Sequence, residues 1–360
     1  MNILTNAPNL FTDKRVLVTG GTGSLGKTLL RRILTGEFGR PEAVIVFSRD
    51  EAKQHEMRLA FQQLSTATEE VIYSDYQKLL HFRIGDVRNY ASISAALRGI
   101  DVVFNAAALK QVPSCEYFPH EAVSTNIEGA ENIVRAIESM RLPVETVVGI
   151  STDKACKPVN VMGMTKAIQE RIFINANIRA PDTRFVCVRY GNVLASRGSV
   201  IPLFHDQIQS GRPVTITTQD MTRFLLSLDQ AVDTIIDAYR IAVKGDILIP
   251  RVPSSKIINI VKALICERNI KIEEVGIRPG EKIHEILVSE DEVYRTVKRE
   301  NYYVIRSILP ELSDDSTITQ ALNGEYSSCS DLMNLEETRK VLVDNKLTIE
   351  DKPDFARAFG

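Results

Sequence analysis

Short apolar runs alternate with longer amphipathic stretches through the first half of the chain. Short runs are typical of buried strands, whereas apolar positions that recur about every three or four residues indicate a helix. We predict strands at residues 15–19, 43–47, 82–87, 101–108 and 144–150. Long helical patterns cover residues 121–140 and 159–178. Because strands and helices alternate over residues 14–190, the pattern predicts an α/β fold with a parallel, doubly wound sheet.

The alternation ends after Tyr190. Loop-forming residues at 191–199 are followed by shorter strands and helices in mixed order. We therefore predict a first domain over residues 1–190 and a smaller mixed α/β lobe over residues 191–360, interleaved with the first and packed on it. In open α/β sheets, ligands bind at the carboxyl ends of the strands, so the chemistry is expected there.

Composition argues against several kinds of partner. The 44 Lys and Arg residues nearly balance the 46 Asp and Glu residues, for a formal net charge of −2, so no basic excess predicts binding to nucleic acid or a membrane. The five cysteines are scattered, and the five histidines show no metal-ligand spacing. No signal-peptide pattern is visible, and no apolar run approaches the ~18 residues that span a bilayer. We expect a cytoplasmic protein with no metal site.

The first predicted strand leads into a glycine-rich turn. Gly20, Gly23 and Gly26 follow it with GxxGxxG spacing, and a helical pattern begins directly afterwards. Such glycines permit a tight turn and let the backbone approach a pyrophosphate at the helix N-terminus. A plain glycine-rich turn is the alternative, but the strand–turn–helix context favours a Rossmann-type dinucleotide-binding domain. The predicted cofactor contacts in this motif are Gly20, Thr22, Gly23, Ser24, Leu25 and Gly26.

The end of the second predicted strand bears on the choice between NAD and NADP. An acidic residue there usually accepts the ribose 2′-hydroxyl of NAD, whereas an arginine suits the 2′-phosphate of NADP. Ser48, Arg49 and Lys53 form a pattern that suits phosphate, because a guanidinium binds phosphate in a bidentate way. We predict NADP as the cofactor. Asp50 keeps NAD as an alternative, and solvated charges at a helix start are the interpretation without a ligand.

Further cofactor contacts are expected along the same edge of the sheet. Asp86, at the tip of the third predicted strand, is placed to hydrogen-bond an adenine amino group. The small residues 106–108 leave room for the nicotinamide ribose, and Lys110 is a candidate ligand for the nicotinamide side or the sugar. The remaining predicted cofactor contacts are Val87, Ala106, Ala107, Ala108, Asn126, Lys166, Tyr190 and Asn192.

The fifth predicted strand delivers Ser151-Thr152-Asp153-Lys154, which brings a hydroxyl, an acid and an amine together. Nicotinamide enzymes with this layout often carry a Tyr four residues before a Lys, and the phenolate takes a proton from a substrate hydroxyl. Here Lys166 is present, but Met162 stands at the tyrosine position. A thioether is neither an acid nor a base. Ordinary alcohol dehydrogenation is therefore disfavoured, and the group that deprotonates O4 stays open.

Thr152, Asp153 and Lys154 suit a different reaction. A hexose oxidised at C4 has an acidic C5 proton, and loss of water across C5 and C6 then needs a base and an acid. We assign Lys154 as the base near C5, on the expectation that burial and its neighbours lower its pKa. Asp153, held protonated, is the expected acid near the C6 oxygen. Thr152 is expected to relay the O4 proton. Hydride is then expected to return from the cofactor to C6. A surface ion pair at the strand end is the alternative.

These residues resemble a known family. Thr152-Asp153-Lys154 with Met162-x-x-x-Lys166 is similar to the extended short-chain dehydrogenase/reductases that act as UDP-N-acetylglucosamine 4,6-dehydratases in polysaccharide and nonulosonic (pseudaminic type) acid biosynthesis. The resemblance covers nearly the whole chain. It rests on blocks at residues 19–26, 48–51, 106–113, 189–193, 197–202, 221–224 and 278–282.

The resemblance implies UDP-N-acetylglucosamine as the substrate and a UDP-2-acetamido-2,6-dideoxy-4-keto-hexose plus water as the products. It implies Asp153 as the acid, Lys154 as the C5 base and Lys166 as the ribose clamp. Several cations on separated loops also suit a diphosphate. The implied substrate contacts are Lys110, Asn192, Arg197, Val200, Arg223, Arg278 and Glu281.

Several alternatives stay open. The family contains enzymes that retain the C5 configuration and enzymes that invert it; retention is favoured because Met162 removes one donor on the opposite face of the sugar. A nucleotide-sugar epimerase on the same scaffold releases no water. A dinucleotide-sensing module catalyses nothing, but a sensor has no need of Asp153, Lys154 and Lys166. Extra apolar positions on the helices at 121–140 and 159–178 predict that they pair across the interface of a homo-oligomer, a dimer or higher.

Overall fold

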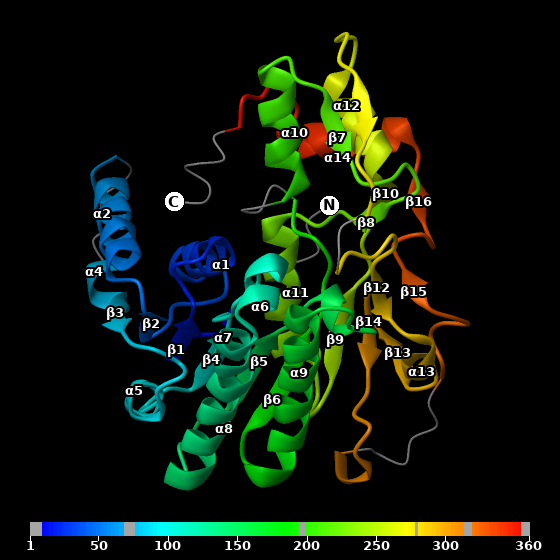
Figure 1. The fold of residues 1–360 in the computed structure, drawn as a ribbon. Coiled ribbons are helices and arrows are strands. Elements are labelled where there is room, and N and C mark those ends of the chain that lie inside the picture. The colour runs from blue at the N-terminus through cyan, green and yellow to red at the C-terminus, as the bar shows by residue number, and fades with distance from the viewer. Residues whose placement is uncertain (1–8, 68–75, 195–198, 278–279, 313–318, 354–360) are drawn as a thin grey trace.

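The computed structural model describes residues 9–67, 76–194, 199–277, 280–312 and 319–353. Its main element is a nine-stranded sheet in the order β13-β14-β9-β6-β5-β4-β1-β2-β3 (Figure 1). The strands are β1 (Arg15–Thr19), β2 (Ala43–Ser48), β3 (Leu80–Ile84), β4 (Val102–Asn105), β5 (Thr146–Ile150), β6 (Arg184–Val188), β9 (Ile247–Pro250), β13 (Thr296–Arg299) and β14 (Tyr302–Ile305). The order β3-β2-β1-β4-β5-β6 is that of a dinucleotide-binding sheet.

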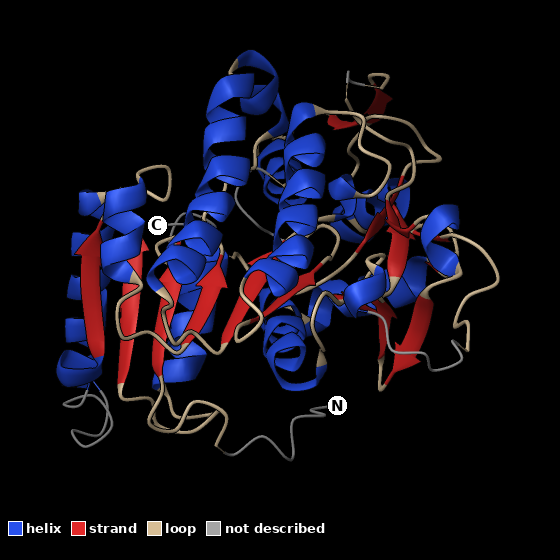
Figure 2. Ribbon diagram, turned by 90° about the horizontal axis from the view of Figure 1, so that it is seen from below, coloured by secondary structure: helices blue, strands red, loops and turns tan. Residues whose placement is uncertain are grey.

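The helices that flank this sheet follow the predicted alternation. They are α1 (Ser24–Leu34), α2 (Glu51–Ala67), α4 (Tyr76–Leu79), α5 (Tyr90–Ala96), α6 (Val112–Tyr117), α7 (Pro119–Val123), α8 (Gly129–Met140), α9 (Val161–Arg179) and α11 (Leu228–Ile241). α5, α8 and α9 pack side by side on one face, and α1 packs on α11 on the other. Figure 2 shows helices on both sides of the sheet.

Cover on both faces explains why the central strands are apolar along their whole length. Every residue of β2, β4 and β5 is buried, as parallel strands between two helical layers require. The pairs from β3 to β9 are all parallel, whereas β14 pairs antiparallel with β9 and β13. The predicted α/β, doubly wound fold is confirmed.

A second part of the chain packs above the carboxyl ends of the strands (Figure 1). Its elements are α10 (Val200–Gln209), β7 (Val214–Ile216), β8 (Thr222–Phe224), β10 (Ser254–Lys256), α12 (Ile257–Ile265), β11 (Ile272–Glu274), β12 (Ile286–Val288), α13 (Glu290–Val293), β15 (Tyr326–Ser327), β16 (Leu332–Met333) and α14 (Leu335–Asp344). The short turn η3 (Pro310–Leu312) lies at the other end of the sheet, next to α9 and Gly245. α10, α12 and α14 enclose an apolar cluster of their own. The large sheet nevertheless takes β9, β13 and β14 from beyond residue 190, so the division at that residue stays a prediction.

No helix in the described ranges is both long enough and apolar enough to cross a membrane.

Candidate active site

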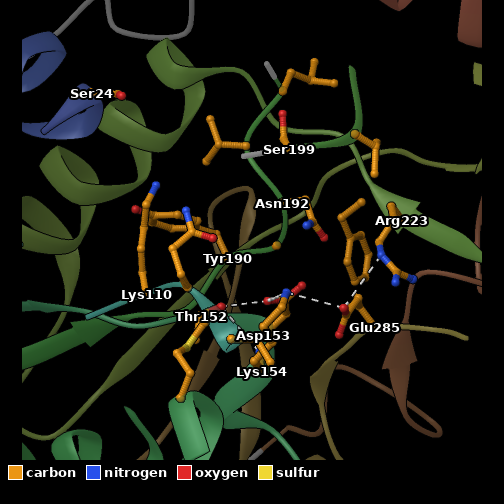
Figure 3. Close-up of a pocket in the computed structure, with 18 of the residues that line it drawn as sticks. Ser24, Lys110, Thr152, Asp153, Lys154, Tyr190, Asn192, Ser199, Arg223 and Glu285 are labelled. Atoms are coloured by element: carbon orange, nitrogen blue, oxygen red, sulfur yellow. Dashed lines mark hydrogen bonds and ion pairs between the residues drawn. The ribbon is translucent and has the colours of Figure 1, made fainter. Parts of the chain in front are cut away.

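A cleft of about 980 Å³ lies at the carboxyl ends of the parallel strands, between the sheet and the second part (Figure 3). Most of the predicted site residues line it. They are Gly20, Thr22, Gly23, Ser24, Leu25, Gly26, Lys53, Ala106, Ala107, Ala108, Lys110, Thr152, Asp153, Lys154, Met162, Lys166, Tyr190, Asn192, Val200, Arg223 and Glu281. Two predicted substrate contacts, Arg197 and Arg278, lie outside the described residues.

The glycine-rich turn leaves room for a phosphate at the start of α1. Gly20 has a φ of +65°, and a Cβ there would lie 2.8 Å from the backbone of Ala106. At Gly23, by contrast, a Cβ would meet a single atom within 4 Å, at 3.4 Å. Gly23 is the N-cap of α1, which has no side-chain cap and no acidic residue in its first turn. The free N–H groups and the open space fit the pyrophosphate of a dinucleotide.

Replacing Gly26 tests this fit. A Cβ at this position would lie 2.5 Å from Gly21 Cα, so Gly26→Ala must move the backbone of the turn. We expect a loss of about 1–3 kcal/mol in the free energy of unfolding and loss of dinucleotide binding, measured by chemical denaturation and calorimetric titration. Gly324→Ala, whose Cβ meets no atom within 4 Å, is the control. Unchanged dinucleotide affinity in Gly26→Ala would contradict the assignment.

Four of the predicted cofactor contacts near the ends of the second and third strands lie outside the cleft lining: Ser48, Arg49, Asp86 and Val87. Ser48 Oγ is hydrogen-bonded to Thr22 Oγ1 at 3.0 Å. The Asp86 carboxylate accepts a hydrogen bond from Arg88 at 2.7 Å and lies 3.7 Å from Arg49. Val87, next to Asp86, is buried in the core. The contacts predicted from these residues to the adenosine end of a cofactor stay predictions.

Asn126 does not face the cleft. The helix predicted over residues 121–140 is interrupted by a π-helical turn at Ser124–Glu128, between α7 and α8, and Asn126 lies in that turn. Its Oδ1 accepts from the Leu109 backbone N–H at 2.9 Å, and its Nδ2 donates to Leu109 O and to Thr165 Oγ1, both at 3.0 Å. With its amide used in this way and 1% of the residue exposed, Asn126 ties the loop after β4 to α9. Its role as a cofactor contact stays a prediction.

Thr152, Asp153 and Lys154 form one hydrogen-bonded chain where β5 ends. Asp153 begins the short helical turn η2 (Asp153–Ala155). Thr152 Oγ1 donates to Asp153 Oδ1 at 2.7 Å, and Lys154 Nζ donates to the same oxygen at 3.1 Å. Asp153 is 1% exposed, and its Oδ2 has no hydrogen-bond partner among the described residues. Because Asp153 is buried in the cleft wall, the alternative of a surface ion pair is excluded.

Close packing of α9 on this turn brings the other predicted catalytic residues to it. A Cβ on Gly163 would lie 2.1 Å from Lys154 O, so the helix start can approach only with a glycine there. Asn160 caps α9 by accepting from the Gly163 N–H at 2.8 Å. Met162 and Lys166 follow on the buried side of the helix and line the cleft.

The charge of Lys154 differs from the prediction. Its Nζ lies 3.1 Å from Asp153 Oδ1 and 3.4 Å from Glu285 Oε1. Burial by itself lowers the pKa of Lys154, but the two carboxylates outweigh burial, and the pKa lies above its ordinary value. The predicted lowering of this pKa is therefore wrong. In this structure, Lys154 is an ammonium held by two buried acids.

Lys166 is the cleft amine whose pKa falls. It is 5% exposed, and burial lowers its pKa to about 8 despite the nearby charge of Glu170. Its Nζ donates to Gln169 Oε1 at 2.6 Å. Met162, four residues earlier, is buried in a small apolar cluster and adds no ionisable group.

Glu285 is a cleft residue that the sequence analysis missed. It is 3% exposed, and its Oε1 lies 3.4 Å from Lys154 Nζ and 3.7 Å from Arg223 Nε (Figure 3). Its Oε2 has no hydrogen-bond partner in the part of the chain that the structure describes. The available signal was a second acid four residues after Glu281, but sequence spacing alone did not distinguish the two.

A buried ionic network behind the cleft was also missed. Arg189, 2% exposed, donates to Glu170 at 2.7 and 3.0 Å and to Glu292 at 2.8 and 3.0 Å. Glu170 Oε1 also accepts from Ser151 Oγ at 2.5 Å. The network therefore joins the end of β5, α9 and α13, and it supports the turn that carries Asp153.

The sheet order, the glycine-rich turn and the cleft above it define an α/β protein of the Rossmann-like short-chain dehydrogenase/reductase class. Within that class, the chain belongs to the family described as "Polysaccharide biosynthesis protein", whose model matches residues 16–307.

Relatives and solved structures agree with this family. A protein named UDP-glucose 4-epimerase from Rickettsia conorii is 42% identical over 345 residues, covering 93% of this chain and 96% of the relative. The crystal structure of Pen from Bacillus thuringiensis is 36% identical, with a TM-score of 0.82, and covers 94% of this chain and 99% of that one. DesIV, a dTDP-glucose 4,6-dehydratase from Streptomyces venezuelae solved with NAD and TYD bound, is 20% identical with a TM-score of 0.62, covering 75% of this chain and 86% of that one. At that identity, the likeness to DesIV shows the fold alone.

Proposed function

We propose that this protein is a UDP-N-acetylglucosamine 4,6-dehydratase. The observation that carries the proposal is the chain of Thr152, Asp153 and Lys154 at the cleft wall, combined with Met162 where a simple dehydrogenase has a tyrosine. An acid and an amine side by side serve an elimination, which must remove a carbon-bound proton and protonate a leaving hydroxyl. Membership of the polysaccharide biosynthesis family supports a sugar substrate.

The residues take the following roles in the proposed reaction. A nicotinamide dinucleotide held by the glycine-rich turn and Lys166 would supply hydride acceptance at C4 and hydride return at C6. Thr152 relays the O4 proton to Asp153 through the hydrogen bond to Asp153 Oδ1. Lys154, as an amine, takes the C5 proton, and Asp153 protonates the C6 oxygen, which leaves as water. Lys166 holds the ribose of the cofactor.

Proton NMR of UDP-N-acetylglucosamine incubated with the enzyme in deuterated water tests this function. The dehydratase is expected to give a C6 methyl group and deuterium at C5. The coupling constants of the product report the C5 configuration, for which we propose retention; a C5-inverting 4,6-dehydratase gives the other pattern. No spectral change with a correctly folded, cofactor-loaded protein would support a sensing module and contradict the proposal.

A nucleotide-sugar 4-epimerase is the second candidate. It is favoured by the name of the Rickettsia relatives, which are about as long as this chain and 42% identical to it. An epimerase changes the configuration at C4 without forming a methyl group or releasing water. The same NMR experiment, repeated with UDP-glucose, separates the two reactions.

The second part of the chain supplies the proposed contacts to the nucleotide sugar. Arg223, Asn192, Val200 and Glu281 line the cleft on that side, and Lys110 lies on the cofactor side. The Arg223 side chain is 11% exposed and is oriented by hydrogen bonds to Thr222 O at 2.7 Å and Ile283 O at 3.1 Å. We assign these residues, with Arg197 and Arg278 outside the described residues, to UDP and the sugar.

The proposed cofactor is NADP, with NAD as the alternative. Lys53 lines the cleft and lies 3.2 Å from Asp50, while the Arg49 side chain is half-exposed. Removing the Lys53 charge in Lys53→Met is expected to weaken NADP binding about tenfold, or ~1.4 kcal/mol, and to leave NAD binding unchanged. Calorimetric titration with both dinucleotides measures the difference. Equal weakening for both would contradict a contact with the 2′-phosphate.

We also propose a homo-oligomer that pairs through α8 and α9. Three apolar residues on the outer side of α9 are 41–47% exposed: Met164, Ile168 and Ile178. Ile168→Glu is expected to dissociate the oligomer, because it places a charge in an apolar contact. Light scattering at micromolar concentration measures the change, with Val243→Glu, at an equally exposed site before β9, as the control. A monomeric wild-type protein would contradict the proposal.

A further inference from the structure

The proposed reaction requires a second proton acceptor besides Asp153. Asp153 can receive the O4 proton from Thr152 only while it is a carboxylate, and Lys154 can take the C5 proton only while it is an amine. In the structure, however, the two carboxylates keep Lys154 protonated. The ammonium proton must therefore move to a group other than Asp153 before the elimination. This inference rests on the proposed function.

Glu285 is the acid that the geometry offers. Its Oε1 is 3.4 Å from Lys154 Nζ, on the side opposite the bond to Asp153, as Figure 3 shows. The residue is 3% exposed, and its Oε2 has no donor among the described residues. A carboxylate oxygen that is shielded from water and has no donor is unfavourable while it is charged. Glu285 is therefore a second buried carboxyl group beside the Lys154 ammonium, at 3.4 Å.

We propose that Glu285 stores the ammonium proton of Lys154 during turnover. An N–H bond of Lys154 breaks and an O–H bond forms on Glu285, which leaves an amine and a carboxylic acid. The amine then takes the C5 proton; the electrons of the C5–H bond form the C5=C6 double bond, the C6–O bond breaks, and Asp153 gives its proton to the departing oxygen. Lys154 later returns its proton to C5 as C6 becomes a methyl group, and it is again an amine. Glu285 acts through Lys154 and is a positioning residue.

The surroundings of Lys154 allow this transfer. The charged groups that face it are Asp153 from the turn after β5, Glu285 from the segment before β12, Arg223 from β8, and Lys282, whose charge reaches Glu285, Asp153 and Lys154. Lys282 Nζ itself donates to Cys156 O at 2.6 Å. The immediate cluster thus holds two acids and three cations, counting Lys154 itself, and moving a proton from Lys154 to Glu285 changes no net charge.

The pH dependence of Glu285→Gln tests the proposal. An internal transfer makes the wild-type kcat nearly independent of pH, because the proton never leaves the site. In Glu285→Gln the amide still accepts a hydrogen bond from Lys154 but cannot accept a proton. Solvent must therefore remove the ammonium proton of Lys154. We expect kcat at pH 7 to fall about 100-fold, to rise about tenfold per pH unit up to pH 9, and KM to change less than about threefold. The readout is the rate of methyl formation by NMR.

Two further variants complete the experiment. Glu285→Asp keeps the acid and is expected to keep a flat profile at a reduced rate; it decides the outcome if Glu285→Gln does not fold. Glu290→Gln removes an exposed acid that pairs with Lys157 and is expected to match the wild type. A flat, near-normal profile in Glu285→Gln, or one shifted to lower pH at full rate, overturns the inference. Wild-type enzyme that forms no C6 methyl group from UDP-N-acetylglucosamine overturns the proposed function as well.

Discussion

Lys154→Met is expected to abolish formation of the 6-methyl product, with kcat lowered on the order of 10³- to 10⁴-fold. Methionine has a similar length and is apolar, so the variant removes the amine without opening the cleft. It also leaves Asp153 and Glu285 without their shared cation, which lay 3.1 and 3.4 Å away. The loss is measured as methyl formation and C5 deuteration by NMR. Binding of the nucleotide sugar, measured by calorimetry, is expected to persist, because the assigned UDP contacts lie elsewhere in the cleft.

Lys157→Met is the matched control. Lys157 lies three residues further along the same segment, is 40% exposed and pairs with Glu290 and Glu325 at the surface. Surface ion pairs contribute about 0–1 kcal/mol, so this variant is expected to keep nearly all activity. Turnover in Lys154→Met within tenfold of the wild type would exclude Lys154 as the C5 base.

Arg189→Met is expected to cause the largest loss of stability. The guanidinium is buried and is the shared cation of Glu170 and Glu292. Removing one member of a buried ion pair leaves an uncompensated charge and costs about 3–5 kcal/mol. The measurement is the free energy of unfolding by chemical denaturation. Because Glu170 also accepts from Ser151, the variant is expected to lose activity even at temperatures where it is folded.

Arg179→Met provides the comparison. Arg179 also bridges two carboxylates, Glu131 at 2.8 Å and Glu138 at 2.5 Å, but its side chain is 29% exposed. Water can therefore solvate both acids when the arginine is removed, and the expected loss is about 0–1 kcal/mol. An equal loss in the two variants would show that burial of the Arg189 network contributes nothing.

The same network predicts acid sensitivity. Burial by itself raises the pKa of Glu292, but the charge and hydrogen bonds of Arg189 outweigh it and lower the pKa to about 2. A carboxyl group whose pKa is lowered on folding stabilises the folded state at pH values above its pKa in the unfolded chain, which is about 4.3. This stabilisation is lost as the pH falls toward 2. We expect the unfolding free energy to fall between pH 5 and 2, and to fall less steeply in Arg189→Met. Denaturation curves across this range measure both slopes.

The elements that could be predicted from sequence are those whose signal is local. Apolar runs predicted β1, β2 and β5 to within a residue or two, because a strand buried on both faces has few polar positions. The glycine spacing located the turn before α1, since Gly20 and Gly26 have no room for a side chain. Lys166 was identified by its spacing in sequence, four residues after Met162 on the same helix.

The tertiary structure decided what depends on charges that are distant in sequence. Lys154 was expected to lose its charge, but Glu285 approaches from a segment far along the chain and, with Asp153, keeps the amine protonated. The partners of Arg189 likewise come from α9 and α13, and no spacing rule connects the three residues. The sequence by itself thus determined the sheet, the phosphate turn and the choice of candidate groups. Their charge states came from the folded structure, because a pKa depends on distances through space and on burial, which only packing sets.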